Sequence, residues 1–129
     1  MRARARISRD LPQPVRRERE GMSSAHEEHI RCCPCLVCGK PPRNDPHHLQ
    51  RGLPANERGT GRRASDQWLI PLCRTCHTWA EATGNDDERL ASVGIDGRAI
   101  ARVLWSHRGS LASIVRVVVR SLQGRGIHV

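Results

Sequence analysis

Two Cys-x-x-Cys pairs are the residues of this chain whose spacing most directly predicts chemistry. Cys35 and Cys38 form the first pair, which Gly39 follows, and Cys73 and Cys76 form the second. Two such pairs separated by a loop are a common way to supply four thiolates to a tetrahedral zinc ion, and the glycine permits the tight turn of a zinc knuckle. The spacing therefore predicts one structural Zn²⁺ site.

Two other uses of these cysteines compete with zinc. Disulfides need an oxidising compartment, and we find no residues that direct the chain to one. A thioredoxin-like redox pair needs a single Cys-x-x-Cys within a βαβ pattern, which the sequence lacks. Cys32 also forms a Cys-x-x-Cys with Cys35, so a shifted ligand set stays open, although Gly39 and the apolar Leu36 and Val37 favour the later pair.

A second group of candidate residues consists of histidines and one glutamate. His47 and His48 are adjacent in the segment DPHHL. In a strand they would point to opposite faces, so that one could bind a metal while the other faces a substrate. His77 and Glu81 are four residues apart, on one face of a helix that begins near the second cysteine pair, and could hold a second cation. For Glu81 alone, a solvated helix residue is the alternative.

These motifs together resemble a known family. The segments CLVCGK, DPHHL, SDQWLIPLCRTCH and GNDDE are similar to those of HNH endonucleases of the ββα-metal fold, in the phage and prophage branch that includes a recombination-enhancement nuclease. The resemblance covers residues 32–105. It implies a metal-dependent endonuclease that hydrolyses DNA phosphodiester bonds in phage or prophage recombination, with a recombinase or another DNA-processing protein as a partner.

The resemblance also implies a role for each residue of the candidate site. His48 would be the general base, and Asp66, near a position that is often Asn in the family, would orient it. His47 and His77 would bind a catalytic Mg²⁺ or Mn²⁺. Glu81 replaces the histidine that many members carry, which leaves either a carboxylate ligand or a weakened site. The alternative function is therefore a zinc-stabilised DNA-binding module that does not cut. The two cysteine pairs match the structural zinc of many members.

The charge of the chain indicates a polyanionic partner. The formal net charge is +9, and all but one of the 22 basic residues are arginines, which bind phosphate through a planar fork. An arginine-rich proteome is the alternative explanation. Because the excess is spread along the chain, we predict DNA as the partner. The candidate phosphate-binding residues, for which a solvated loop is the alternative, are Arg51, Arg58, Arg62, Arg63 and Arg74.

Composition limits the core that can position these residues. The chain has 129 residues and three tryptophans but neither tyrosine nor phenylalanine, so a metal is needed to stabilise a small core. No apolar run approaches the roughly 20 residues of a membrane span, which predicts a soluble protein with no membrane partner. The resemblance to phage and prophage nucleases implies a cytoplasmic location in a bacterial host cell.

Three parts follow from these patterns, in a small α+β fold. Residues 1–24 alternate arginine and alanine and then contain prolines, which predicts a disordered arm. Residues 25–84 carry the cysteines and form the zinc-binding HNH ββα-metal domain. Residues 85–129 form a helical extension.

Capping residues define the helices of this extension. Asn85 caps a helix that ends at Gly94, and Asp96 caps a second one, on which Ile100, Val103 and Leu104 share a face. The last stretch, SLASIVRVVVRSLQG, predicts a third helix, although its β-branched run would also suit a strand.

Overall fold

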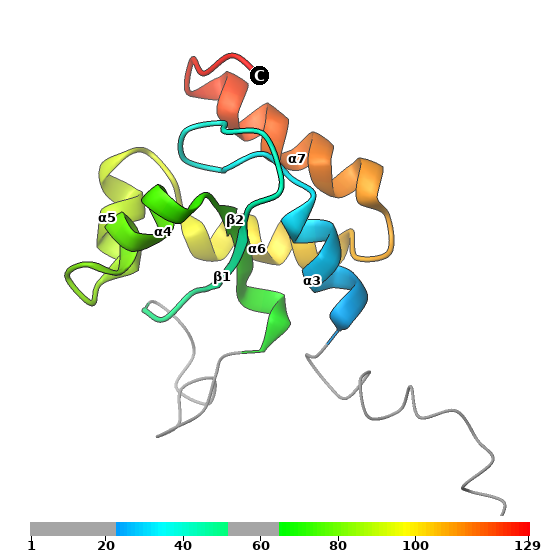
Figure 1. Ribbon diagram of the computed structural model, residues 1–129, viewed down its shortest axis with the longest axis horizontal. Coiled ribbons are helices and arrows are strands. Elements are labelled where there is room, and N and C mark those ends of the chain that lie inside the picture. The colour runs from blue at the N-terminus through cyan, green and yellow to red at the C-terminus, as the bar shows by residue number, and fades with distance from the viewer. Residues whose placement is uncertain (1–22, 52–64) are drawn as a thin grey trace, which may run out of the picture.

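The computed structural model describes residues 23–51 and 65–129 of the chain (Figure 1). In chain order these residues form α3 (Ser24–Arg31), β1 (Asp45–His48), the 3-10 turn η2 (Asp66–Trp68), β2 (Leu69–Leu72), α4 (Arg74–Glu81), α5 (Asp86–Ser92), α6 (Gly97–Ser106) and α7 (Leu111–Gly124). The small α+β class is confirmed. The predicted arm lies outside the described residues except at its end, where Ser23 caps α3 and Ser24 already belongs to that helix.

The two strands pair antiparallel and lead directly into a helix. His47 lies opposite Ile70, and His48 lies opposite Leu69. Pro46 faces Pro71, and because neither proline has an N–H to donate, the ladder of hydrogen bonds is limited to a few residues. β2 is buried along its whole length, and α4 begins immediately after it. This unit therefore carries the candidate histidines from both strand and helix.

The core lies where β2 meets α6, and α3 and α7 contribute to it. Figure 1 shows α6 running behind the two strands, with α3 beside them and α7 at the top of the molecule. The helices after residue 85 therefore share one core with the sheet. The fully buried aliphatic side chains include Ile30, Leu36, Leu69, Ile70, Leu72, Leu90, Leu104, Ile114, Val118 and Leu122.

The predicted helices of residues 85–129 are confirmed. The side chains of Asn85 and Asp96 accept hydrogen bonds from backbone N–H groups in the first turns of α5 and α6, and Gly94 follows α5 with φ +83°. The last stretch is helical, because α7 buries every fourth residue of its apolar side. Within the part of the chain that the structure describes, no helix has the length and apolar character that crossing a membrane requires.

One detail of the α6 prediction is wrong. Leu104 is buried and Ile100 packs against the core, but the Val103 side chain is 43% exposed. The buried positions of α6 are Gly97, Ala101 and Leu104, a narrow stripe on which Gly97 lets the helix approach Leu90 of α5 and Leu49. Val103 lies outside that stripe.

Asn44 connects three segments just before β1. Its side-chain amide donates hydrogen bonds to the carbonyl oxygens of Cys33, at 2.8 Å, and Lys40, at 3.0 Å. Its backbone N–H donates to the carbonyl of Arg31 at 3.0 Å. Since Asn44 is only 6% exposed, these carbonyls have little access to water. The residue therefore fixes the end of α3, the zinc-knuckle turn and the start of β1 relative to one another.

Replacing Asn44 with alanine is expected to lower the free energy of unfolding by about 1–3 kcal/mol, because the buried Cys33 carbonyl loses its side-chain donor, whereas the Lys40 carbonyl still accepts from the N–H of Cys35. Urea unfolding followed by circular dichroism measures this. Arg43→Ala is the matched control. The Arg43 side chain, next to Asn44 in sequence, forms an exposed ion pair with Glu28, so the expected change in the free energy of unfolding is below about 1 kcal/mol. Equal losses in both variants would contradict this role for Asn44.

Candidate metal and catalytic site

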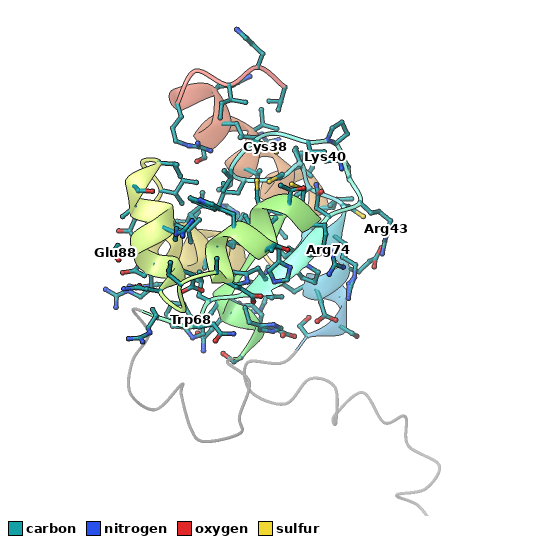
Figure 2. The ribbon with its side chains drawn as sticks, turned by 60° about the vertical axis from the view of Figure 1, so that its left-hand side comes forward. Cys38, Lys40, Arg43, Trp68, Arg74 and Glu88 are labelled. Atoms are coloured by element: carbon teal, nitrogen blue, oxygen red, sulfur yellow. The ribbon has the colours of Figure 1, made fainter. Side chains whose placement is uncertain are left out.

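The four cysteines of the two pairs lie together. Their sulfur atoms are all within 4.8 Å of one another, and the sulfurs of Cys38 and Cys73 are 3.8 Å apart. Thiolates about 2.3 Å from a tetrahedral zinc ion are separated by roughly this distance. Figure 2 shows Cys38 in the upper part of the molecule, near Lys40. The cluster is compatible with a metal such as zinc.

Local backbone structure brings each pair into shape. In the first pair, the N–H of Gly39 donates to the carbonyl of Cys35 at 2.8 Å, and Gly39 has φ +83°, a conformation that side chains disfavour. In the second pair, Cys73 caps α4, and its sulfur accepts from the N–H of Cys76 at 3.4 Å. The predicted knuckle and the predicted start of the helix are therefore both present.

The electrostatics of this cluster favour a bound cation. Burial and the charge of Cys35 raise the pKa of the Cys76 thiol. Burial, the largest single influence, acts to raise the pKa of Cys73, but the hydrogen bonds from the N–H and thiol of Cys76 and from the thiols of Cys38 and Cys35 together lower that pKa. Four thiolates at this spacing repel one another, so they are stable together only when a cation neutralises part of their charge.

The two remaining cysteines stand apart from the cluster. Cys33 is fully buried in the core, where burial, with a smaller contribution from Cys32, raises the pKa of its thiol to about 12. Cys32 is the C-terminal cap of α3, and its thiol donates to Glu28 at 3.7 Å. The structure therefore groups Cys35, rather than Cys32, with Cys38 and the second pair.

The C-terminal segment covers the zinc knuckle, which the sequence did not reveal. The Arg125 guanidinium donates hydrogen bonds to the carbonyl oxygens of Leu36 and Val37. A Cβ on Gly39 would lie 3.0 Å from a Val129 methyl group, so the chain end approaches the knuckle closely. The turn of the first cysteine pair and the C-terminal segment, 88 or more positions apart in sequence, thus lie side by side.

A second cluster joins β1 to α4. His47, His77 and Glu81 each direct one ligand atom into a region where these atoms lie within 4.8 Å of one another. The Glu81 carboxylate is 3.2 Å from His77 Nε2 and 3.5 Å from His47 Nδ1. Ligands about 2.1 Å from a divalent ion are separated by roughly 3.0–3.4 Å, so the spacing fits a cation.

Carboxylates hold the other nitrogen of each histidine. His47 Nε2–H donates to Asp86 at 2.8 Å, and His77 Nδ1–H donates to Asp45 at 2.9 Å. These bonds assign the protons, so His47 Nδ1 and His77 Nε2 are left as lone-pair donors toward Glu81. His47 Nδ1 is also buried without a hydrogen-bond partner among the described residues. A buried nitrogen with a free lone pair beside Glu81 and His77 fits a metal ligand.

Asp86 is a residue of the candidate site that sequence reasoning missed. It is 2% exposed, and it accepts hydrogen bonds from the backbone N–H groups of Gln50 and Arg51 as well as from His47. Burial alone would raise the pKa of Asp86, but the hydrogen bond from His47 and those two N–H groups outweigh burial and lower it. The motif GNDDE carried the signal, but its acids are also typical of the first turn of a capped helix.

His48 lies beside this cluster and is held separately. Its Nε2 donates to Asp66 at 2.9 Å, and the second oxygen of Asp66 accepts from the N–H of Ser23 at 2.8 Å. The Asp66 side chain is buried, whereas the His48 side chain is 13% exposed. The cap of α3 therefore fixes the carboxylate that orients His48, a link between distant residues that the sequence did not show.

A cleft of about 480 Å³ exposes these groups. Its walls come from α3, β1 and α4, and they include Glu27, Arg31, His48, Arg74 and His77. Figure 2 shows Arg43 and Arg74, which both line the cleft, below Cys38 and Lys40. The cleft thus combines imidazoles and guanidinium groups with the carboxylates of Glu27 and Asp45.

The predicted phosphate-binding arginines differ in their placement. The Arg74 side chain is 81% exposed at the cleft, where its Nε lies 3.2 Å from Asp45. Arg51 is exposed, and its Nε donates to the carbonyl of Gly84 at 3.1 Å, next to the Asp86 site. Arg58, Arg62 and Arg63 lie outside the described residues.

Comparison with known proteins places the chain in a family without giving it an activity. A stretch of 61 residues is 33% identical to the uncharacterized protein YdfU of Escherichia coli (strain K12) and covers 47% of the chain but only 16% of that relative. No solved structure matches the chain significantly. The model of a protein family of unknown function, DUF968, matches residues 12–91, which is more than half of the chain. The chain belongs to the DUF968 family.

Proposed function

We propose that the protein is a metal-dependent endonuclease of the HNH type that hydrolyses phosphodiester bonds of DNA. One observation carries the proposal: His47, His77 and Glu81 converge as ligands, while the adjacent His48, held by Asp66, opens to a cleft that His77 also lines. A metal-ligand set and a positioned imidazole in one cleft are the two components that phosphodiester hydrolysis needs.

The order of elements supports the ββα-metal assignment within this proposal. β1 contributes His47 and His48, β2 pairs with β1, and α4 follows β2 and contributes His77 and Glu81. The four-cysteine cluster joins the segment before β1 to the start of α4, so a zinc ion would fix the strands relative to the helix. A small core can then hold the site in one geometry.

The residues of the chain supply the acid–base chemistry. His48 donates Nε2–H to Asp66, so its Nδ1 carries the lone pair that accepts the proton of an attacking water. Asp66 orients the ring and stabilises its positive charge after proton transfer, since the carboxylate is itself held by Ser23. A divalent ion bound by His47, His77 and Glu81 would stabilise the negative charge that develops on the phosphate and the leaving oxygen.

The charges of the chain support DNA as the substrate. The net charge of +9 favours association with a polyanion, and Arg31, Arg43 and Arg74 line the cleft beside His48. These guanidinium groups would bind backbone phosphates on either side of the scissile bond. Within the same proposal, the protein acts on DNA in the cytoplasm of a bacterial host, in phage or prophage recombination alongside a recombinase.

The direct test is incubation of purified, zinc-containing protein with supercoiled plasmid DNA. Nicked or linear DNA should form when Mg²⁺ or Mn²⁺ is added and should not form in EDTA. If the protein binds the plasmid but does not cleave it with any divalent cation tested, the alternative is favoured. That alternative is a zinc-stabilised DNA-binding module in which Glu81 has replaced an essential ligand.

Asp86→Asn tests the metal site without removing a ligand. The amide keeps the size of the side chain but loses the charge that holds His47, so the affinity for Mn²⁺ is expected to fall about 10–100-fold. The readouts are Mn²⁺ binding by calorimetry and the Mn²⁺ concentration that gives half-maximal cleavage. Asp87→Asn, in the same first turn of α5, is the matched control and should keep the wild-type affinity. Unchanged Mn²⁺ affinity in Asp86→Asn would exclude a role for this carboxylate in metal binding.

A further inference from the structure

We propose that Glu27, His48 and Asp66 form a second cation site, which takes Mn²⁺ or a similar transition-metal ion and blocks the general base. The proposal rests on the proposed function, because it assigns regulation by excess metal to the same catalytic histidine. It concerns a set of ligands that is separate from both the cysteine cluster and the His47, His77 and Glu81 cluster.

The three ligands come from three different elements. Glu27 projects from α3, His48 from β1 and Asp66 from η2, and their ligand atoms all lie within 4.8 Å of one another. His48 Nε2 and the nearer Asp66 oxygen are 2.9 Å apart. Two neighbouring ligands about 2.1 Å from an octahedral ion are roughly 3 Å apart, so a cation fits where a proton now bridges the pair.

The site is open and correctly charged for a divalent ion. Glu27 and His48 both line the cleft, so an ion reaches them from solvent. The two carboxylates balance the charge of one divalent cation. Arg31 lies 3.8 Å from Glu27, in a partly exposed contact that holds the carboxylate only weakly.

The donor set selects among metals. An imidazole nitrogen with two carboxylates suits Mn²⁺, Co²⁺ and Zn²⁺, whereas Mg²⁺ prefers oxygen ligands and retains its waters. Mg²⁺ would therefore occupy this second site poorly, whereas at the His47, His77 and Glu81 site the phosphate oxygens of bound DNA and water would complete its shell. Because both Mg²⁺ and Mn²⁺ are proposed for catalysis, activity in Mg²⁺ serves as a control in which the second site stays largely empty.

Cation binding would disable the base by displacing a proton. The Nε2–H proton of His48 leaves to solvent, and the nitrogen lone pair and the two carboxylates bind the ion in its place. A divalent ion bound at Nε2 would repel a proton at Nδ1, so the ring would no longer serve as the base. Binding therefore releases about one proton and removes the acceptor for the attacking water.

Equilibrium dialysis of the zinc-containing protein against Mn²⁺ tests the site independently of cleavage. The wild type is expected to bind two Mn²⁺ ions in addition to zinc, and His77→Ala should retain one of them. Glu27→Gln should weaken the second Mn²⁺ at least about tenfold. Glu28→Gln is the matched control, because Glu28 is the next residue on α3 and is paired with Arg43 instead. Wild-type binding of both ions by Glu27→Gln would overturn the proposal.

Cleavage measurements separate this proposal from the proposed function. The cleavage activity of the wild type and of Glu28→Gln should rise and then fall as the Mn²⁺ concentration increases. The activity of Glu27→Gln should rise without the later fall. With Mg²⁺ in place of Mn²⁺, no protein should show inhibition at high concentration. Identical inhibition in Glu27→Gln and wild type would refute the second site and leave the nuclease assignment intact. If the wild type does not cleave DNA but binds a Mn²⁺ ion that Glu27→Gln loses, the second cation site would be supported and the nuclease assignment refuted.

Discussion

Replacing His48 with alanine is expected to reduce DNA strand cleavage at least 10²–10⁴-fold, the range typical for loss of a positioned general base. Zinc content and DNA affinity should stay near the wild-type values, because a base lowers the free energy of the transition state far more than that of bound DNA. The fold should persist, because Ser23 continues to hold Asp66 after His48 is removed. Plasmid nicking in Mg²⁺, with filter binding and circular dichroism in parallel, measures all three properties.

Two further variants make this result specific. His77→Ala removes a metal ligand rather than the base, so higher Mg²⁺ or Mn²⁺ should restore part of its activity, which no metal concentration should do for His48→Ala. His107→Ala is the matched control, since His107 is exposed at the end of α6 and should cleave like the wild type. Full activity in His48→Ala would refute the assigned mechanism, even if the protein cleaves DNA.

Much of the site could be predicted because it is encoded by short spacings. The Cys-x-x-Cys pairs and the i, i+4 relation of His77 and Glu81 are local, and local geometry depends little on the rest of the fold. That His47 and His48 would face opposite sides if their segment were a strand follows from the same kind of local geometry. Helix caps at Asn85 and Asp96 likewise act through backbone groups only a few residues away.

The residues that were missed act through tertiary contacts. Asp86 meets His47 across 39 positions, and Ser23 meets Asp66 across 43. In the sequence Asp86 is one of several acids at the start of a helix, which the helix dipole alone would explain. Only the packing of α5 near the end of β1 selects this acid from its neighbours. Such a selection depends on the folded chain and has no local signature.

The same distinction explains the error at Val103. Apolar periodicity predicted the core face of α6 from large side chains, but the buried positions include Gly97 and Ala101, and a Cβ on Gly97 would lie 2.9 Å from Leu90 and 3.2 Å from Leu49. Small residues carry almost no hydrophobic signal, although they decide which face a helix can bring near its neighbour. The stripe is therefore displaced from Val103 toward the smaller positions.

Removing Cys73, one of the four clustered thiols, is expected to unfold the middle of the protein. Cys73 is 4% exposed and lies between β2 and α4, so its thiolate would tie the sheet, the helix and the first cysteine pair to one ion. Structural zinc contributes about 10–16 kcal/mol in small domains, whereas the net stability of a native domain is about 5–15 kcal/mol. Loss of the ion therefore exceeds what a core without tyrosine or phenylalanine can offset.

The measurement combines elemental analysis with unfolding of Cys73→Ser and Cys32→Ser. The wild type should contain about one tightly bound Zn²⁺ per chain, and Cys73→Ser should contain little zinc and be unfolded or insoluble. Cys32→Ser is the matched control, because Cys32 lies outside the cluster and contacts only Glu28 through its thiol. It should keep its zinc and lose less than about 1 kcal/mol of stability, as expected for a substitution that breaks one weak exposed hydrogen bond. A folded wild-type preparation without zinc would refute the structural metal, since the four thiols would then hold the strands and α4 together without any cation.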